Sequence, residues 1–313
     1  MRFRHHFLIV TLLCAVPVSL AATERGVMVR VAQIYLSPDT SSPRIATIDR
    51  GREVAVIEKS RDWLHVLASL SEPTETVEGR DVSGWILDKG VVRSATPKGD
   101  KVLFGEAVAS EQEASRRGGR KGADKDALRL YYRAAEYFPQ SPIAGEALYR
   151  AADIRWQIDR ADMFGRPSGR DPRNRLYGID EDLMKQVIKK FPHSKWADLA
   201  AYHLLDNKVC GDWQGEPKCP EKEAEVYEKY ADEHPQSPVA AEALYNAAYR
   251  RSALIELYKN NGKSSHIGDA RAKAVALAQR VIANFPQSDW ANRAQTLLYK
   301  LEQRIPTYGN EVE

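Results

Sequence analysis

Residues 138–152 read FPQSPIAGEALYRAA, and residues 234–248 read HPQSPVAAEALYNAA. The same frame returns as FPHSKWADLAAYHLL at 191–205 and as FPQSDWANRAQTLLYKL at 285–301. The four prolines that share a place in this frame lie 53, 43 and 51 positions apart. A unit that recurs at such intervals indicates stacked helix pairs lengthened by loops or longer helices, and the uneven intervals argue against a perfectly regular solenoid.

The frame has the chemistry of one helix ending and another beginning. Pro139 lacks a backbone N–H and its ring clashes with the preceding turn, so the helix before it must end there. Ser141 can accept hydrogen bonds from the free N–H groups of a new helix, and Pro142 suits the first position of that helix. Ser237 and Pro238 repeat the pair. We therefore predict helix starts capped by these serines.

Small residues follow each proline at spacings of three and four, which place them on one face of a helix. Alanine on such a face lets a neighbouring helix approach closely. A tyrosine ten residues after each of three prolines is bulky enough to fill gaps between helices. We interpret these tyrosines as packing residues, with ligand binding as the alternative. The small residues after the first proline are Ala144, Ala147 and Ala151, and the three tyrosines are Tyr149, Tyr202 and Tyr245.

The pattern aromatic-Pro-x-Ser-x-x-Ala-x-x-Ala resembles the helix boundary of tetratricopeptide (TPR) repeats in bacterial envelope proteins. Examples are the lipoprotein of the outer-membrane assembly machine and the periplasmic coordinators of the Tol-Pal system. We assign residues 97–124 to a linker and first helix and residues 125–313 to TPR-like helical repeats. Because TPR arrays serve as scaffolds for many unrelated partners, the resemblance implies protein binding without naming the partner.

The N-terminus has the organisation of a secretory signal over residues 1–22. Two arginines precede an apolar stretch at 7–18, and Ser19-Leu20-Ala21 forms a small-x-small cleavage site. The stretch is too short and too broken to predict a membrane span. Leu13 stands before Cys14 where a lipoprotein signal needs a small residue, so we do not expect lipidation. We expect a periplasmic or outer-envelope protein with no transmembrane span in the mature chain.

Composition adds few constraints. The 313-residue chain has a formal net charge of +3, with 43% hydrophobic and 28% charged residues. Loss of Arg2 and Arg4 with the signal leaves +1, which gives no argument for a nucleic-acid partner. A chain of this length and composition can bury a core, and we expect it to form two domains.

Cys210 and Cys219 are the cysteines that remain once the signal is removed. They lie in VCGDWQGEPKCPE, between two helical repeats. In an oxidising envelope, a pair at this spacing around a turn with glycine and proline predicts a disulfide that closes a small loop. Metal or redox use is the alternative, but a zinc site requires more ligands than this loop offers. We expect neither a metal nor a cofactor.

Between the signal and residue 96 the periodicity becomes strand-like. Short β-branched and aromatic runs at 54–57 and 63–67 predict strands of a small barrel over residues 25–96. The run IYLSPDTSSPRIATIDRGREVAVIEKSRDWLHV and the later GWILDKGVV resemble the bacterial SH3 family. The resemblance rests on Leu36-Ser37-Pro38, the Gly-containing turn and strand over 48–56, Asp62-Trp63 and Gly84-Trp85-Ile86.

Members of that family often bind cell-wall peptide or protein segments. The resemblance therefore implies a ligand groove lined by Tyr35, Trp63 and Trp85. Two departures affect this inference: Gln33-Ile34-Tyr35 replaces the family's asparagine-aliphatic-arginine, and residues 67–83 make an unusually long hairpin connection. The alternative, which we prefer, is that the two tryptophans fill a barrel too small to have another core.

A basic cluster separates the predicted barrel from the first repeat. SEQEASRRGGRKGADKD, at 110–126, carries Arg116-Arg117 and Arg120-Lys121 among three glycines. These side chains are candidates for contact with phosphates or anionic surfaces. A solvated turn between two helices is the interpretation that we prefer.

The sequence lacks recognisable catalytic patterns. It has no His-Glu-x-x-His, its histidines are scattered, and neither cysteine of the 210–219 loop stands in a nucleophile motif. We therefore predict a non-enzymatic adaptor or scaffold, an SH3-like β-barrel followed by an all-α repeat array. It would bind envelope proteins, peptide segments or peptidoglycan. A peptidoglycan hydrolase, or an accessory protein of one, is the alternative.

Overall fold

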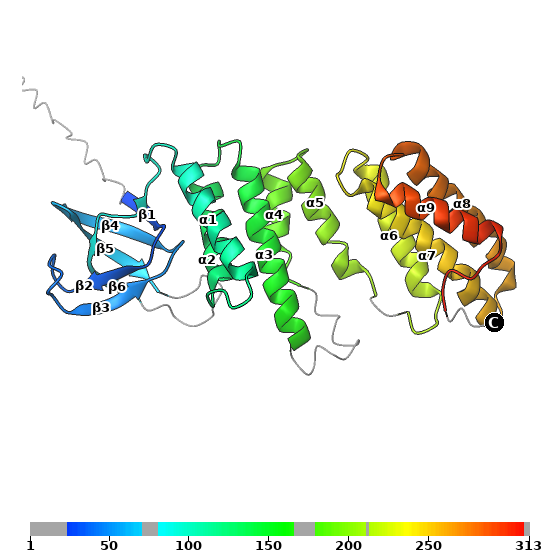
Figure 1. Cartoon of the computed structure of the whole chain (residues 1–313), viewed down its shortest axis with the longest axis horizontal. Helices are drawn as coiled ribbons and strands as arrows, with labels where there is room; N and C mark the ends of the chain where they lie inside the picture. Colours follow the sequence, from blue (N-terminus) through cyan, green and yellow to red (C-terminus); the bar gives the residue numbers. More distant parts are fainter. Residues whose placement is uncertain (1–23, 71–80, 166–178, 211–212, 310–313) are drawn as a thin grey trace, which may run out of the picture.

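The computed structural model describes residues 24–70, 81–165, 179–210 and 213–309. It places a curled antiparallel sheet at one end of a row of helices (Figure 1). This arrangement confirms the predicted fold class of a β domain followed by a helical array. The predicted signal at 1–22 lies outside the described residues.

Among the described residues, seven strands form the sheet, in the spatial order β3-β2-β6-β5-β4-β1-β7, and every pair is antiparallel. Alternate residues of β5 and β6 are buried, as expected when one face of a sheet covers a core and the other does not. The strands are β1 (Glu24–Met28), β2 (Ala32–Tyr35), β3 (Arg44–Ile48), β4 (Glu53–Ser60), β5 (Trp63–Ser69), β6 (Asp81–Leu87) and β7 (Val91–Val92).

Aliphatic side chains fill the inner face of the sheet. The cluster includes Ile34, Leu64 and Ile86, all fully buried, and its buried members contain no tryptophan. Trp63 and Trp85 are half-buried on the opposite face. The preferred interpretation of these tryptophans as barrel core is therefore wrong, because the alternate aliphatic positions already occupy the narrow interior.

The helices after α1 (Gly99–Ser115) form two modules with the same order of elements. Pro139 and Pro235 are 96 positions apart, and Pro192 and Pro286 are 94 apart, so the four copies of the frame are two copies of a longer unit. This explains the uneven intervals. The first module contains α2 (Ala123–Tyr137), α3 (Ala144–Gly165), α4 (Asp182–Lys190) and α5 (Lys195–His203); the second contains α6 (Lys218–Glu233), α7 (Ala240–Asn260), α8 (Ile267–Asn284) and α9 (Asp289–Glu302). Within the described ranges, no helix has the length and apolar character needed to cross a bilayer.

The serines of the frame act in two ways. Ser194 and Ser288 are N-caps, and their hydroxyls accept from the N–H groups of Ala197 and Ala291 at 3.2 and 3.1 Å. Each of these two helices begins directly after its serine.

The predicted caps at Ser141 and Ser237 are wrong in position. Their hydroxyls accept from the N–H groups of Ile143 and Val239, which precede the helices, at 3.4 and 3.3 Å. They also bond to other side chains, because Ser141 donates to Asp100 of α1 at 2.6 Å and Ser237 bonds to Tyr230 at 2.7 Å. The backbone first makes a tighter turn, in which the Ala144 N–H donates to the Ser141 carbonyl at 3.0 Å. The helices α3 and α7 therefore begin three residues after their serines.

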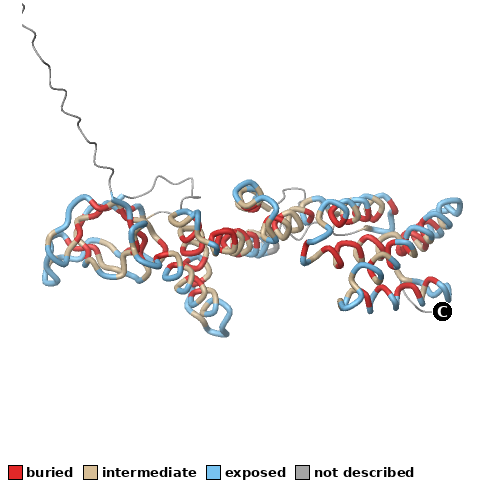
Figure 2. Tube along the Cα trace, turned by 90° about the horizontal axis from the view of Figure 1, so that it is seen from above, coloured by how far each residue is buried: buried red, intermediate tan, exposed pale blue. Residues whose placement is uncertain are grey.

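The sheet and the first helices share one hydrophobic core. Val27 of β1 and Val92 of β7 are buried in the same cluster as Leu103 of α1 and Tyr131 of α2. Figure 2 shows buried residues in the strands and along the helices that follow them. The sheet therefore closes the N-terminal end of the helical row, where a repeat array requires a capping element. Residues 97–124 join the two parts through α1 and its place in this core.

Glu53 of β4 connects the sheet to α2. Its carboxylate accepts from the hydroxyl of Tyr137 and pairs with Arg25 and with Arg133, whose Nη1 is 3.4 Å away. Burial alone raises the pKa of Glu53, but the hydrogen bonds from Arg25 and Tyr137 and the charge of Arg133 lower it below its usual value. The stability contributed by this carboxylate is present above the pKa of an unfolded glutamate and is lost as the pH falls through the folded pKa.

The two modules meet through side chains of α5 and α6. The ring of Tyr202 lies 5.2 Å from that of Tyr230, and the Tyr230 hydroxyl donates to the carbonyl of Asp198 at 2.8 Å. His234 Nδ1 lies 2.8 Å from the Asp198 carboxylate. Burial raises the pKa of Tyr230 to about 12, so its hydroxyl remains a donor at physiological pH.

The last described helix, α9, carries polar residues at positions where α5 contacts the next module. Asn292, Gln295 and Thr296 of α9 occupy the places that Asp198, Ala201 and Tyr202 occupy in α5, and all three are exposed. Where α5 presents an aromatic ring to the next module, α9 presents polar side chains to water. This is the pattern of a capping helix in a repeat protein.

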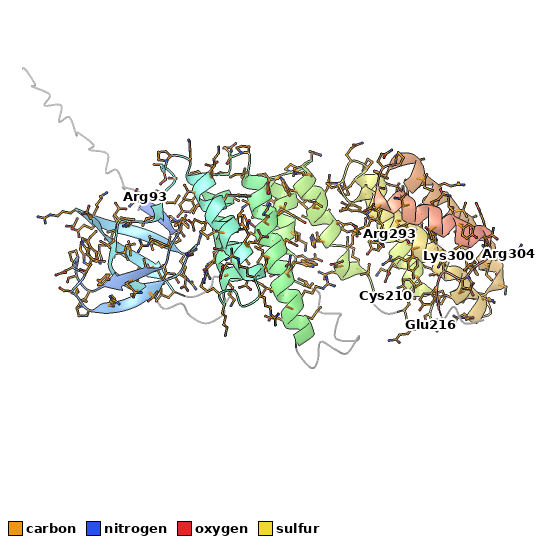
Figure 3. The ribbon with its side chains drawn as sticks, viewed as in Figure 1. Arg93, Cys210, Glu216, Arg293, Lys300 and Arg304 are labelled. Atoms are coloured by element: carbon orange, nitrogen blue, oxygen red, sulfur yellow. A yellow bond between two sulfur atoms is a disulfide. The ribbon has the colours of Figure 1, made fainter. Side chains whose placement is uncertain are left out.

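Cys210 and Cys219 form the predicted disulfide, with their Cα atoms 6.0 Å apart. The Cys210 N–H donates to Glu223 of α6 at 2.8 Å, and Asn261 donates to the Gly215 carbonyl at 2.9 Å. Figure 3 labels Cys210 and Glu216 on the segment that joins α5 to α6. The bridge therefore holds this segment against the second module.

Replacing both cysteines by serine is expected to lower the free energy of unfolding by about 2–3 kcal/mol, because the bridge closes a loop of about ten residues. Urea unfolding of the oxidised wild type and of the Cys210→Ser/Cys219→Ser variant measures the loss. Reductant should reproduce it in the wild type and leave the double variant unchanged. Two thiols that react with a labelling reagent in the native oxidised protein would contradict the bridge.

Candidate functional site

The outer face of the N-terminal sheet gathers the three aromatic residues expected to line a groove. Tyr35 of β2 lies directly opposite Trp85 of β6, and directly opposite residues of an antiparallel pair share a face. The Tyr35 and Trp63 rings meet edge to face, with centroids 5.5 Å apart. Tyr35 is 8% exposed, whereas both tryptophans are half-buried. The strands thus bring all three into one cluster.

His65 belongs to the same cluster, and the sequence reasoning missed it. Its ring stacks on Trp85 with centroids 5.0 Å apart, and its Nε2 lies 3.0 Å from the Ser83 hydroxyl. The strand pairing places His65 directly opposite Trp85. The sequence signal that could have identified His65 is the alternation of the strand WLHVLAS. Because successive side chains point to opposite faces, a buried Leu64 places Trp63 and His65 together on the other face. We call Tyr35, Trp63, His65 and Trp85 the aromatic face.

Apolar and cationic groups border the aromatic face. Leu67 is 42% exposed and Leu87 is 37% exposed, on the outward-facing positions of β5 and β6. The Arg44 guanidinium carbon lies 6.0 Å from the centre of the Tyr35 ring. Large half-buried rings with an imidazole and a guanidinium beside them suit ligands that combine apolar faces with hydrogen-bonding groups. Sugar rings and extended peptides are such ligands.

The helical array carries a second aromatic feature, repeated in both modules. Tyr149 packs on Trp196 and Tyr245 packs on Trp290, with ring centroids 5.4 and 5.3 Å apart. All four side chains are half-buried. The near-identical geometry in the two modules supports a packing role. Burial raises the pKa of Tyr149 and of Tyr245, so both phenols stay neutral at physiological pH.

A cation covers each of these tryptophans. The Lys195 ammonium lies 4.4 Å from the centre of the Trp196 ring, and the Arg293 guanidinium carbon lies 4.6 Å from that of Trp290 (Figure 3 labels Arg293 on α9). The two cations occupy different positions of the repeat, because Lys195 directly precedes its tryptophan and Arg293 lies three positions after its own. Contact of this kind contributes to helix packing at modest strength.

Titratable side chains also meet in the first module. His203 Nε2 lies 3.2 Å from the Tyr149 hydroxyl and 3.4 Å from the Asp153 carboxylate. Burial raises the pKa of Asp153, and the charge of His203 opposes that shift. Across the described residues, no group of three or more His, Cys, Asp or Glu side chains is placed to hold a metal ion.

Comparisons with known proteins give no family. No protein-family model matches the chain. No curated protein matches it. Two solved structures similar to it are titled "DHF79 filament" and "Crystal structure of de novo designed helical repeat protein DHR64". The first is 17% identical, and the match covers 64% of this chain and 97% of the other, with a TM-score of 0.25. The second is 20% identical, and the match covers 66% of this chain and 92% of the other, with a TM-score of 0.22. TM-scores this low carry no argument about fold or function.

Proposed function

We propose that the chain is a non-catalytic adaptor of the bacterial cell envelope, in which an SH3-type domain binds a cell-wall or peptide partner and a TPR-type array holds a protein partner. The observation that carries this proposal is the aromatic face. Its tryptophans are not needed for the barrel core, which is aliphatic, and they remain partly accessible on an outward surface. Clustered, partly exposed tryptophan and tyrosine are typical of recognition surfaces.

The array supports the same proposal through its shape and its ends. Stacked helix pairs give an extended surface, and the sheet covers one end of it. Two recognition elements on one chain act together through effective concentration, so two modest affinities suffice. The signal-like N-terminus and the cysteine pair support secretion to the periplasm or the outer envelope.

Co-sedimentation of the purified chain with peptidoglycan sacculi tests the proposal. Trp85→Ala is expected to weaken sacculus binding about tenfold or more, since it removes the ring that stacks on His65 and belongs to the residue paired with Tyr35 across the strands. Trp290→Ala removes a tryptophan of similar partial burial from the array and should leave this binding unchanged. Circular dichroism of each variant checks that both remain folded.

Two results would overturn the adaptor proposal. Release of soluble peptidoglycan fragments that depends on the protein would indicate a hydrolase. Equal binding by wild type and Trp85→Ala would show that the aromatic face does not carry the interaction.

A further inference from the structure

A cavity of about 350 Å³ lies where the sheet meets the first helix. Its lining includes Ser110 and Glu113 of α1, Arg116 and Arg120 of the turn after α1, and Arg50 of the turn between β3 and β4. The cavity therefore collects three arginines from segments far apart in the sequence. It is separate from the aromatic face and does not rest on the adaptor proposal.

Ser110 is a buried polar residue without an evident structural purpose. It is 1% exposed, and its hydroxyl finds no hydrogen-bond partner among the described residues. A buried hydroxyl left without a partner destabilises the folded state. Because Ser110 lines the cavity, a ligand in that cavity can supply the partner that the protein does not.

The lining of the cavity carries more positive than negative charge. Three guanidinium groups and one carboxylate line it, so an added anion lowers the electrostatic energy of the lining. The lining arginines also pair with carboxylates around the cavity, and Arg129 shares one of these carboxylates. The pairs are Arg50 with Glu106 at 3.6 Å, Arg116 with Glu113 at 3.2 Å, and Arg120 and Arg129 with Asp126.

The turn that carries Arg116 and Arg120 is fixed against the end of α1. The Gly119 N–H donates to the Arg116 carbonyl at 2.9 Å, and the Arg120 N–H donates to the Glu113 carboxylate at 3.2 Å. A Cβ on Gly119 would lie only 1.9 Å from the Glu113 carbonyl oxygen, so the backbone approaches as closely as glycine allows. The two arginines are therefore held beside the cavity by the backbone of the turn.

We propose that this cavity binds the dianionic phosphate group of a phosphate monoester. The Ser110 hydroxyl donates to one phosphate oxygen, and the guanidinium groups of Arg50, Arg116 and Arg120 bind the others. A dianion is favoured over a single carboxylate because it must compete with carboxylates already paired with these arginines. A cavity of this volume lies in the range of small-molecule sites, so it also has room for the organic part of the ester.

Isothermal titration with inorganic phosphate and with glycerol 3-phosphate, at constant ionic strength against chloride, tests the site. Arg116→Gln is expected to weaken both affinities about tenfold, the loss typical of one charge-assisted hydrogen bond. Arg117→Gln makes the same charge change at the neighbouring exposed residue, which does not line the cavity, and should change affinity less than about twofold. Equal losses in the two variants, or no saturable binding at millimolar ligand, would overturn the proposal.

Ser110→Ala separates a ligand-binding role from a structural one. The variant should bind phosphate more weakly, while its thermal stability without phosphate stays equal to that of the wild type or rises, because an unpaired hydroxyl has been removed. Lower stability with unchanged phosphate affinity would show a structural role and contradict the site.

Vesicles distinguish a soluble ester from a lipid headgroup. Binding of glycerol 3-phosphate without binding to phosphatidic acid in phosphatidylcholine vesicles identifies a soluble ligand. Vesicle binding that Arg116→Gln abolishes and Arg117→Gln preserves identifies a headgroup. Vesicle binding that both variants weaken equally is diffuse charge attraction and counts against the cavity.

Discussion

Replacing Arg250 by methionine is expected to lower the free energy of unfolding by about 3–5 kcal/mol, the cost of leaving a buried charge without its partner. The Arg250 Nε lies 2.7 Å from the carboxylate of Glu223, whose side chain is only 2% exposed. The guanidinium also stacks on Tyr227 at 4.4 Å and donates to Asn246. Chemical unfolding in urea, with the disulfide intact, measures the loss.

A surface ion pair provides the matched control. Arg280 and Asp232 lie 2.6 Å apart, but their side chains are 41% and 54% exposed. Arg280→Met should therefore cost less than about 1 kcal/mol. Adding Glu223→Gln to Arg250→Met removes the unpaired charge and should recover part of the lost stability. A double variant as unstable as Arg250→Met would show that stacking, and not charge, dominates.

Gly51→Ala is expected to destabilise the protein by about 2–5 kcal/mol, through backbone strain of about 1–2 kcal/mol and overpacking of about 1–3 kcal/mol. Gly51 has a φ of +73°, and an added Cβ would lie 2.5 Å from the Cβ of Arg129 and 2.9 Å from the backbone nitrogen of Leu130. The β3–β4 turn therefore touches the backbone of α2. Thermal and urea unfolding measure the effect.

Gly262→Ala separates the two causes. Gly262 has a φ of +70°, but apart from its own chain neighbours no described residue has an atom within 4 Å of an added Cβ. This variant carries the backbone strain alone and should lose only about 1–2 kcal/mol. If Gly51→Ala were no more destabilising than Gly262→Ala, the close contact between the sheet and α2 would be refuted.

The repeat frame and the cysteine pair were predictable because both depend on local sequence. Proline ends a helix wherever it falls, so Pro139 and its counterparts mark helix ends without knowledge of the tertiary structure. Cys210 and Cys219 are nine positions apart, which limits the bridge to a small loop. The change from strand to helix near residue 96 was visible for the same reason.

The orientation of the tryptophans was not predictable from composition. Trp63 and Leu64 are both apolar, so either can face the core, and a shift of one residue exchanges the two faces of a strand. The aromatic face follows from the pairing of β2, β5 and β6, which joins residues 20 to 50 positions apart.

The cavity beside Ser110 and the core shared by the sheet and the first helices depend on contacts between residues far apart in the sequence. Tyr137 reaches Glu53 across 84 positions, and the Arg129 side chain reaches the Arg50 carbonyl across 79. Local periodicity contains no information about such pairs. The basic cluster at 116–121 was visible in the sequence, but Arg50 and Ser110, which complete the cavity, were not.

Because Val27 and Val92 complete the core around Leu103, the helical array cannot be transplanted by itself. A chimaera that begins at α1 would expose this apolar surface to water and would need a redesigned polar helix in place of the sheet. The favourable place to exchange parts lies between α5 and α6, where Tyr202 of one module packs against Tyr230 of the next. A designer could lengthen the array there by inserting a further copy of the module, keeping the sheet at one end and α9 at the other.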